Sequence, residues 1–200
     1  MGSAALLETT CEMLREIGPG KITLAEVARR SNVDPRLIRY YFNDRAGLLR
    51  ATVESLSQRY QRMVDERIRE GDSAEVQLRK RFETFLQFQL EYPYFRRLLV
   101  DEIIPSEDPA AERILREVSQ KGVGNYASIL EQGEAAGSLR TVDPQLFYIC
   151  LIGMQEMATV GAPILRKLGH PAIDSPDYAK VFSKFAMDLI LDGLKSANSD

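Results

Sequence analysis

The chain has 200 residues, of which 44% are hydrophobic and 28% are charged. These fractions are those of an ordinary folded protein with a substantial core, and they argue against a disordered chain. No apolar run approaches the roughly 18–20 residues that a membrane-spanning helix needs, and the first residues do not resemble a secretory signal. We therefore expect a cytoplasmic protein that does not enter a membrane.

The net charge of −3 is unevenly distributed along the chain. Residues 1–50 contain eight Lys or Arg and six Asp or Glu, whereas residues 51–200 contain 18 and 23, so the two parts carry +2 and −5. Because a polyanion responds to the local field, the N-terminal quarter is the part suited to nucleic acid. Cys11 and Cys150 lie in apolar helical stretches, so we expect buried thiols of a reducing compartment rather than a disulfide.

The sequence predicts helices throughout. Apolar residues recur at spacings of three and four, as in Phe82, Phe85 and Leu86, and the sustained alternation typical of strands is hard to find. Helix starts carry Asp or Ser before proline, as at Asp34-Pro35, because the side-chain oxygen caps free N–H groups and proline loses no hydrogen bond there. The predicted helices, about nine in number, cover residues 4–17, 24–31, 35–41, 45–70, 74–91, 94–103, 110–136, 144–168 and 177–195.

Two of the short helices, 24–31 and 35–41, are separated by Asn32-Val33-Asp34. A three-residue turn with an Asn able to adopt a left-handed conformation, followed by an apolar residue, is typical of a helix-turn-helix. The expected core of this motif is Leu24, Val27, Ala28, Val33, Ile38 and Phe42. The N-terminal end and outer face of the second helix, the part that enters a major groove, then carry Pro35, Arg36, Leu37, Arg39 and Tyr40.

A small capped hairpin with merely solvated arginines would share this helical pattern. A solvated face, however, seldom concentrates basic and aromatic residues while its acids, Asp34 and Asp44, stand at cap positions. The concentration within ten residues favours DNA binding; its members are Arg36, Arg39, Arg45, Tyr40 and Tyr41.

A wider pattern in the first 50 residues resembles the DNA-binding domain of the TetR family of bacterial regulators. It consists of Thr23-Leu24-Ala25-Glu26-Val27-Ala28, Val33-Asp34, Tyr40-Tyr41-Phe42-Asn43-Asp44-Arg45 and Leu48-Leu49. Further along, Gly137-Ser138-Leu139-Arg140 and Asp143-Pro144 are loosely similar to the regulatory domain of that family. The resemblance implies a ligand-responsive regulator that works as a homodimer on palindromic or near-palindromic operator DNA, most simply as a repressor that its effector releases.

The resemblance also implies individual contacts with DNA. Thr23 and Arg45 would contact phosphate at helix N-termini, where backbone N–H groups also point at the anion. Tyr40 and Tyr41 would contact phosphate, sugar or base edges.

The chain departs from the family pattern at three places. Pro35-Arg36-Leu37 replaces the usual Lys/Ser-Gly-Thr opening, so a bulky arginine stands where a glycine lets the helix approach the bases. Arg39 replaces the commonest tyrosine, and Ala46-Gly47 stands where a Glu is usual. The operator of a relative therefore does not carry over to this chain.

The first three predicted helices are short and the later ones long, which predicts an all-α fold in two parts. Residues 1–47 would form a three-helix DNA-binding domain, and residues 48–200 a helical bundle that binds ligand and dimerises. The last two predicted helices have more apolar residues than one subunit can bury, which indicates a four-helix dimer interface. The predicted interface residues are Leu146, Ile149, Met157, Val160, Val181, Phe182, Phe185 and Leu189.

The long helices are also rich in aromatic and sulfur-containing side chains. Packing of an ordinary bundle core explains most of them. Within this family some would line a cavity for a small apolar or amphipathic ligand, with a few polar groups to orient it. The predicted ligand-binding residues are Phe85, Gln89, Tyr126, Met154 and Gln155.

Two other classes of protein compete with this interpretation. An enzyme is disfavoured because His170, the only histidine, lies in a Gly-His-Pro loop, and no catalytic triad, phosphate loop or metal-ligand set is found. We therefore expect no catalytic residues, no metal site and no cofactor. A helical adaptor or small-molecule-binding protein without a DNA role would have the same bundle but no basic recognition helix.

Overall fold

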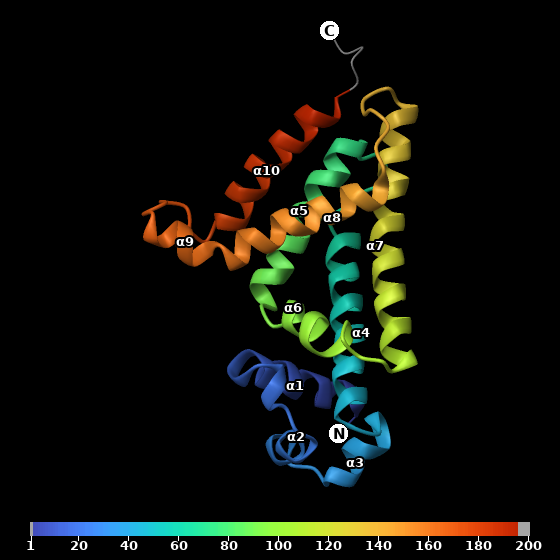
Figure 1. Cartoon of the computed structure of the whole chain (residues 1–200), viewed down its shortest axis with the longest axis vertical. Coiled ribbons are helices and arrows are strands. Elements are labelled where there is room, and N and C mark those ends of the chain that lie inside the picture. Colours follow the sequence, from blue (N-terminus) through green and yellow to red (C-terminus); the bar gives the residue numbers. More distant parts are fainter. Residues whose placement is uncertain (1, 196–200) are drawn as a thin grey trace. The chain divides into compact units, whose positions relative to one another are not determined.

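The structure is a computed structural model that describes residues 2–195, and the elements in this range are helices. This confirms the all-α prediction. A single isolated bridge between Leu139 and Lys195 is the one piece of β pairing in the described range. The elements, labelled in Figure 1, are α1 (Ser3–Ile17), η1 (Pro19–Lys21, a 3₁₀ turn), α2 (Leu24–Ser31), α3 (Pro35–Phe42), α4 (Arg45–Asp65), α5 (Ala74–Glu91), α6 (Phe95–Arg97), η2 (Leu98–Ile103, a π-helix), α7 (Pro109–Ala135), α8 (Pro144–Val160), α9 (Ala162–Lys167) and α10 (Tyr178–Leu194).

Two predicted helices have a different form in the structure. The helix expected over residues 94–103 is one α-helical turn, α6, which continues as the wider π-helix η2. The helix expected over residues 144–168 is divided at Gly161 into α8 and α9. Pro163 in the first turn of α9 explains the break, because proline has no N–H with which to continue the hydrogen bonds of α8.

The chain forms two compact units, which we call the first unit and the second unit. The first unit comprises residues 1–59 and 91–118, and the second comprises residues 60–90 and 119–200. The chain passes between them within α4, at the end of α5 and within α7. Among the described residues, no helix is long and apolar enough to cross a membrane.

The core of the first unit follows the apolar periodicity of its short helices. In α2, Val27 and Ala28 are buried, and in α3 Ile38 is fully buried. Leu48 and Leu49 at the start of α4 are also buried, so this helix begins inside the core of the helix-turn-helix. The start of α4 is therefore fixed to the recognition motif by packing as well as by the chain.

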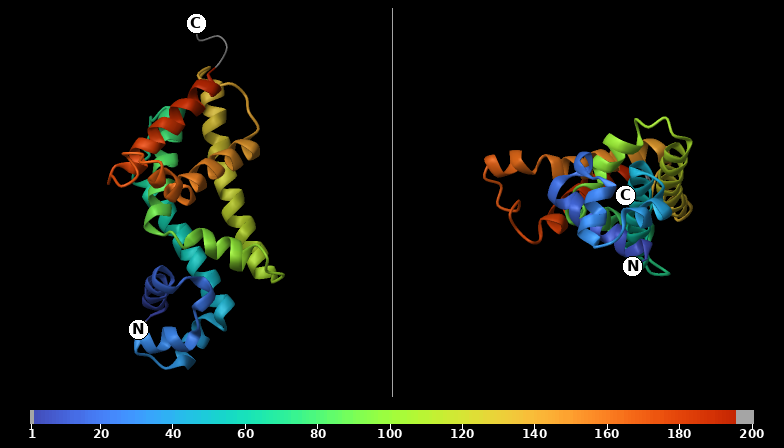
Figure 2. Two further views of the ribbon diagram at one scale, coloured as in Figure 1. Left: turned by 60° about the vertical axis from the view of Figure 1, so that its left-hand side comes forward. Right: turned by 90° about the horizontal axis from the view of Figure 1, so that it is seen from below.

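The second unit packs α5, α7, α8 and α10 around one apolar cluster. Figures 1 and 2 show α8 crossing α5, and the amide of Gln155 on α8 donates to the carbonyl of Phe82 on α5 at 3.0 Å. Gly133 of α7 permits close packing there, because a Cβ at this position would lie 2.3 Å from the side chain of Leu139. The buried cluster consists of Ala74, Leu78, Phe82, Tyr126, Ile129, Leu130, Leu139, Leu151, Ala186, Met187, Leu191 and Leu194.

Candidate nucleic-acid interface and regulatory site

The turn between α2 and α3 has the geometry of a helix-turn-helix. Thr23 caps α2, where its Oγ1 accepts from the N–H of Glu26 at 3.2 Å. Asn32 ends α2 in the left-handed conformation that the sequence predicted, with φ 52° and ψ 48°. Asp34 then caps α3 by accepting from the N–H of Arg36 at 2.7 Å. The two helices therefore start and stop through local side-chain signals.

The expected core of this motif is largely buried. Val27, Ala28, Ile38 and Phe42 have at most 9% of their surface exposed, whereas Leu24 and Val33 are half-buried.

The opposite face of α3 is open to solvent. Arg36 and Arg39 are exposed, and neither guanidinium forms an ion pair among residues 2–195. Tyr40 is 81% exposed and Tyr41 41% exposed, with their rings edge to face at a centroid distance of 5.2 Å. The remaining predicted contact residues, Pro35 and Leu37, lie at the N-terminal end of α3, exposed and half-buried respectively. The face thus presents free positive charge and aromatic edges together.

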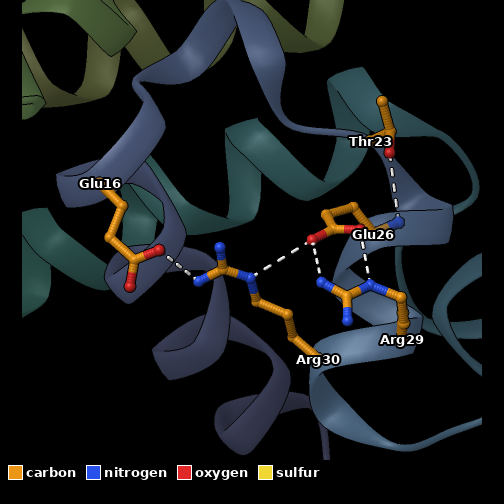
Figure 3. Close-up of polar contacts among 5 residues, drawn as sticks. All are labelled: Glu16, Thr23, Glu26, Arg29 and Arg30. Atoms are coloured by element: carbon orange, nitrogen blue, oxygen red, sulfur yellow. Dashed lines mark hydrogen bonds and ion pairs between the residues drawn. The ribbon is translucent and has the colours of Figure 1, made fainter.

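Two other arginines of the motif are neutralised by glutamates (Figure 3). Arg29 binds both carboxylate oxygens of Glu26, at 2.9 and 2.6 Å. Arg30 lies between Glu26 of α2 and Glu16 of α1, at 3.4 and 2.5 Å. The hydrogen bonds from Arg29, ahead of the smaller contribution of Arg30, lower the pKa of Glu26 to about 2. The unpaired positive charge of the motif is therefore concentrated on α3.

Arg45, the first residue of α4, makes several bonds within the first unit. Its Nε donates to the carbonyl of Ile22 at 2.9 Å and its Nη2 to the carbonyl of Pro19 at 2.8 Å. Its Nη1 and Nη2 also bind the carboxylate of Glu102 in η2, at 2.8 and 2.7 Å. The Glu102 hydrogen bonds raise the pKa of this guanidinium. The phosphate contact expected of Arg45 would have to compete with these bonds, which join η1, α4 and η2.

Further contacts attach residues 91–108 to the helix-turn-helix within the first unit. Arg50 of α4 forms an ion pair with Asp108 at 2.6 Å. Arg15 of α1 donates to the carbonyl of Glu91 at 3.2 Å. A rearrangement of residues 91–108 would thus act directly on α1 and α4, which support α3.

Gly47 follows Ala46, which stands where the family pattern has a Glu, and it lies in the tight turn from α3 into α4. A Cβ at this position would lie 1.9 Å from the carbonyl oxygen of Phe42. The N–H of Gly47 donates to Oδ1 of Asp44 at 2.7 Å, which caps α4. The tight turn from α3 into α4 therefore requires a residue without a side chain at position 47.

The residues predicted to bind ligand lie in the second unit on α5, α7 and α8. Gln89 and Gln155 are buried, and each donates one hydrogen bond, to Glu156 at 2.9 Å and to the carbonyl of Phe82. The Oε1 atoms of both glutamines are buried without a hydrogen-bond partner among the described residues. Of the rest, Tyr126 is buried, and Phe85 and Met154 are half-buried.

The predicted dimer residues lie on α8 and α10. Seven of the eight are exposed, between 47% for Val181 and 70% for Leu146. Phe182 differs, because it is half-buried and its ring stacks on Phe82 at a centroid distance of 6.5 Å. Cys150 was expected to be buried but is exposed. It lies on α8 between the exposed Ile149 and Gly153, where an added Cβ would have no atom within 4 Å.

Two family models match the sequence. One, described as "Bacterial regulatory proteins, tetR family", matches residues 6–52. The other, described as "Tetracyclin repressor-like, C-terminal domain", matches residues 71–200, which is more than half of the chain. The chain belongs to the TetR family of bacterial regulatory proteins. As a TetR-family protein it is a transcriptional regulator with a DNA-binding helix-turn-helix, and α3 is the second helix of that motif.

Individual relatives match this TetR-family chain over part of its length. The transcriptional regulator BetI of Escherichia coli O45:K1 (strain S88 / ExPEC) is 32% identical over 74 residues, which are 37% of this chain and 38% of BetI. BetI of Escherichia coli (strain K12 / DH10B) is 38% identical over 52 residues, which are 26% of this chain and 27% of BetI. The chain thus aligns with well under half the length of these curated relatives.

Solved structures share the fold over nearly the whole chain. A protein of unknown function from Rhodococcus sp. RHA1 has a TM-score of 0.74 at 19% identity, covering 97% of this chain and 95% of that one. The ketosteroid regulator KstR2 of Mycobacterium tuberculosis has 0.69 at 14%, covering 97% and 95%. AibR in complex with isovaleryl coenzyme A and operator DNA has 0.70 at 15%, covering 94% and 96%.

Proposed function

We propose that this TetR-family regulator is a repressor that reads operator DNA with α3 and is released by a small amphipathic molecule. The observation that carries the DNA role is the exposed face of α3, where Arg36 and Arg39 have no ion pair among the described residues. The neighbouring arginines of α2 are neutralised, so a non-specific basic surface does not account for this arrangement. The protein would act in the cytoplasm, where its operator is.

The arginines would divide the work on DNA. Arg36, at the N-terminal end of α3, is best placed for a base edge, with the O6 and N7 atoms of guanine as its expected partners. Arg39 would bind phosphate, together with the hydroxyl of Thr23, which can still donate while its oxygen caps α2. The bonds of Arg45 support a different role from the phosphate contact expected from the family pattern. We assign it to positioning α4 and η1 beneath the DNA-binding face.

The protein would bind DNA as a homodimer through α8 and α10. The exposed apolar residues of these helices support this, since a large apolar face seldom remains open to water. A two-fold interface would place two α3 helices about one DNA turn apart, roughly 34–36 Å or somewhat more, on a palindromic site.

The effector would bind within residues 56–160, at side chains of this range that belong to the second unit. The unpaired Oε1 atoms of Gln89 and Gln155 support this, because buried acceptors without partners suit orientation of a ligand. Phe85, Tyr126 and Met154 would contact its apolar part. A neighbouring fold, that of AibR, holds both an acyl coenzyme A and operator DNA, which makes such coupling plausible for this architecture. The expected coupling free energy is about 1–3 kcal/mol.

Retention on heparin and binding to random duplex DNA test the DNA role. The expected result is binding that falls steeply with salt and that is weaker, with a smaller salt dependence, in an Arg36→Gln/Arg39→Gln double variant. A helical adaptor or a small-molecule-binding protein without a DNA role would show weak, salt-insensitive retention in both proteins.

A further inference from the structure

Arg81 of α5 is a cation in the second unit without an acidic partner. Its Nε is enclosed and has no hydrogen-bond partner among the described residues, and no carboxylate there forms an ion pair with it. The basic residues beside it in the sequence are paired, Arg79 with Asp188 at 2.7 Å and Lys80 with Asp72 at 2.6 Å. Arg81 is half-buried, and an enclosed N–H without an acceptor carries a desolvation cost, so an anion bound beside it would be stabilised.

Two tyrosines, Tyr60 and Tyr126, lie near this cation, and a third, Tyr148, lies beside Tyr126. Tyr60 of α4 lies near Arg81, whose positive charge lowers the pKa of its hydroxyl against the larger rise caused by burial. Tyr126 of α7 lies near both Tyr60 and Arg81, whose electrostatic interactions act on its pKa, and its ring is 6.0 Å from that of Tyr148 on α8. The ring of Tyr148 packs against Gly122 of α7, where an added Cβ would lie 2.8 Å from the hydroxyl of Tyr148. The cluster is thus assembled from residues distant in sequence.

The tyrosine hydroxyls remain protonated and can donate hydrogen bonds. Burial raises the pKa of Tyr60 to about 12, although Arg81 opposes the rise. Burial also raises the pKa of Tyr148, and that of Tyr126 to well above its usual value. Neutral phenol hydroxyls and a guanidinium can all donate hydrogen bonds, and none of them carries a negative charge. Such a set of donors suits a carboxylate, which accepts hydrogen bonds and is negatively charged.

An apolar wall adjoins the donors. The rings of Phe85 and Phe88 lie 5.1 and 5.6 Å from the ring of Tyr60, and Phe147 lies 6.0 Å from Tyr126. Phe85 and Phe88 follow Arg81 by four and seven residues, so α5 presents charge and rings on one face. The single cation suits one negative charge rather than a polyphosphate.

We propose that the effector site takes an amphipathic organic acid whose single carboxylate binds Arg81 and the hydroxyls of Tyr60, Tyr126 and Tyr148. This inference rests on the proposed effector function and adds the charge and orientation of the ligand. The apolar part of the acid lies against the rings of Phe85, Phe88 and Phe147.

The test compares acids with alcohols of the same carbon skeleton. Linear probes of six to sixteen carbons and naphthalene-based probes, each as a carboxylic acid and as the matching alcohol, are titrated into the full-length protein by calorimetry. The best acid is expected to bind at least about tenfold more tightly than its alcohol. Equal affinity within each pair, or no binding by any acid, would overturn the proposal.

Variants of α5 locate the preference. Arg81→Gln is expected to bring the acid and its alcohol to within about twofold of each other, whereas Arg81→Lys retains most of the preference because it keeps the charge. Arg79→Gln is the matched control, since Arg79 is two residues away and paired with Asp188, and it should leave the preference unchanged. A preference that persists in a folded Arg81→Gln protein, judged by its helical circular dichroism, contradicts the assignment.

Release of DNA separates this inference from the proposed function. An acid that binds through Arg81 but leaves DNA affinity unchanged would keep the head-group assignment and refute the effector role. An alcohol that binds as tightly as its acid and releases DNA would refute the head-group assignment and keep the effector role.

Discussion

At the scale of single residues, arginines of equal charge have different surroundings in the first unit. Arg29 and Arg30 are bound by Glu26, and Arg45 by a glutamate and two carbonyls. Arg36 and Arg39 have no ion pair within residues 2–195. Sequence alone gives these residues the same formal charge, and only their contacts separate those available to DNA from those that stabilise the fold.

Substitution of the α3 arginines tests this division. Arg36→Ala should lower discrimination at one base position by about 1–3 kcal/mol. Arg39→Ala should weaken binding to all sequences and lower the slope of log affinity against log salt by about one. Arg29→Ala is the control, since its charge is already paired, and it should change neither quantity appreciably. Unchanged base preference in Arg36→Ala, measured by fluorescence anisotropy on a set of duplexes, would reverse the assignment.

Gly47 gives a prediction on stability. Gly47→Ala places a methyl group against the Phe42 carbonyl and should lower the free energy of unfolding by about 1–3 kcal/mol or more. Gly124 of α7 has no atom within 4 Å of an added Cβ, so Gly124→Ala should stabilise the protein slightly through helix propensity. Urea unfolding checks both, and equal effects of the two substitutions would contradict the packing argument.

At the scale of helices, short-range signals in the sequence were sufficient to place most elements. Asp34 caps α3 and Asp143 caps α8 in the structure, as the Asp-Pro pairs predicted, and Asn32 adopts its expected left-handed conformation. The break between α8 and α9 follows from Pro163, whose missing N–H outweighs the continuous apolar pattern that predicts one long helix. The π-helical form of η2 has no sequence signal that we can identify.

Contacts between helices were not predictable in the same way. Arg45 and Glu102 are 57 residues apart, and no local spacing connects them. The sequence does not distinguish Arg81 from the two basic residues before it, Arg79 and Lys80, because it does not reveal which of the three form ion pairs. The exposed residues of α8 and α10 were recognisable, since an excess of apolar positions is visible in composition alone, although Phe182 is used in the core of its own subunit.

The bond between α4 and η2 can be tested through Glu102. If Arg45 positions α4, Glu102→Gln should weaken DNA binding, because the guanidinium loses its charged partner. If Arg45 binds phosphate directly, the same substitution should strengthen DNA binding by freeing it. Glu107→Gln removes the same charge from an exposed site nearby in the sequence. It therefore measures how much DNA affinity rises merely because a negative charge that repels DNA is lost. Salt-dependent anisotropy compares the two variants.

The stability of α2 should depend on pH through Glu26, which pairs with Arg29 and Arg30 of the same helix. Its pKa is lowered to about 2 in the folded protein from an ordinary value of 4.5, so its ion pairs stabilise the fold above pH 4.5. That stabilisation is lost as the pH falls from 4.5 towards 2. The difference in unfolding free energy between wild type and Glu26→Gln should therefore shrink over this range. A difference that stays constant down to pH 2 would contradict the pairing in Figure 3.

At the scale of the whole molecule, the proposed homodimer can be tested at the exposed apolar face of α10. Phe185→Asp alters a side chain that is 64% exposed in the single chain, so the subunit should stay folded while the dimer dissociates. Val76→Asp, on the exposed face of α5, is a control for added charge. Sedimentation at micromolar concentration should give a dimer for wild type and the control and a monomer for Phe185→Asp. A wild-type monomer would contradict the dimer proposal.

Selection of bound sequences from a random duplex pool tests the central claim, that α3 reads operator DNA, most directly. Wild-type protein should enrich a palindromic or near-palindromic site with half-sites about 10–10.5 base pairs apart or somewhat more. Selection with Arg36→Ala should lose information at one position in each half-site and keep the spacing. Failure of the wild-type protein to enrich any sequence, or an identical site selected by Arg36→Ala, would contradict the account.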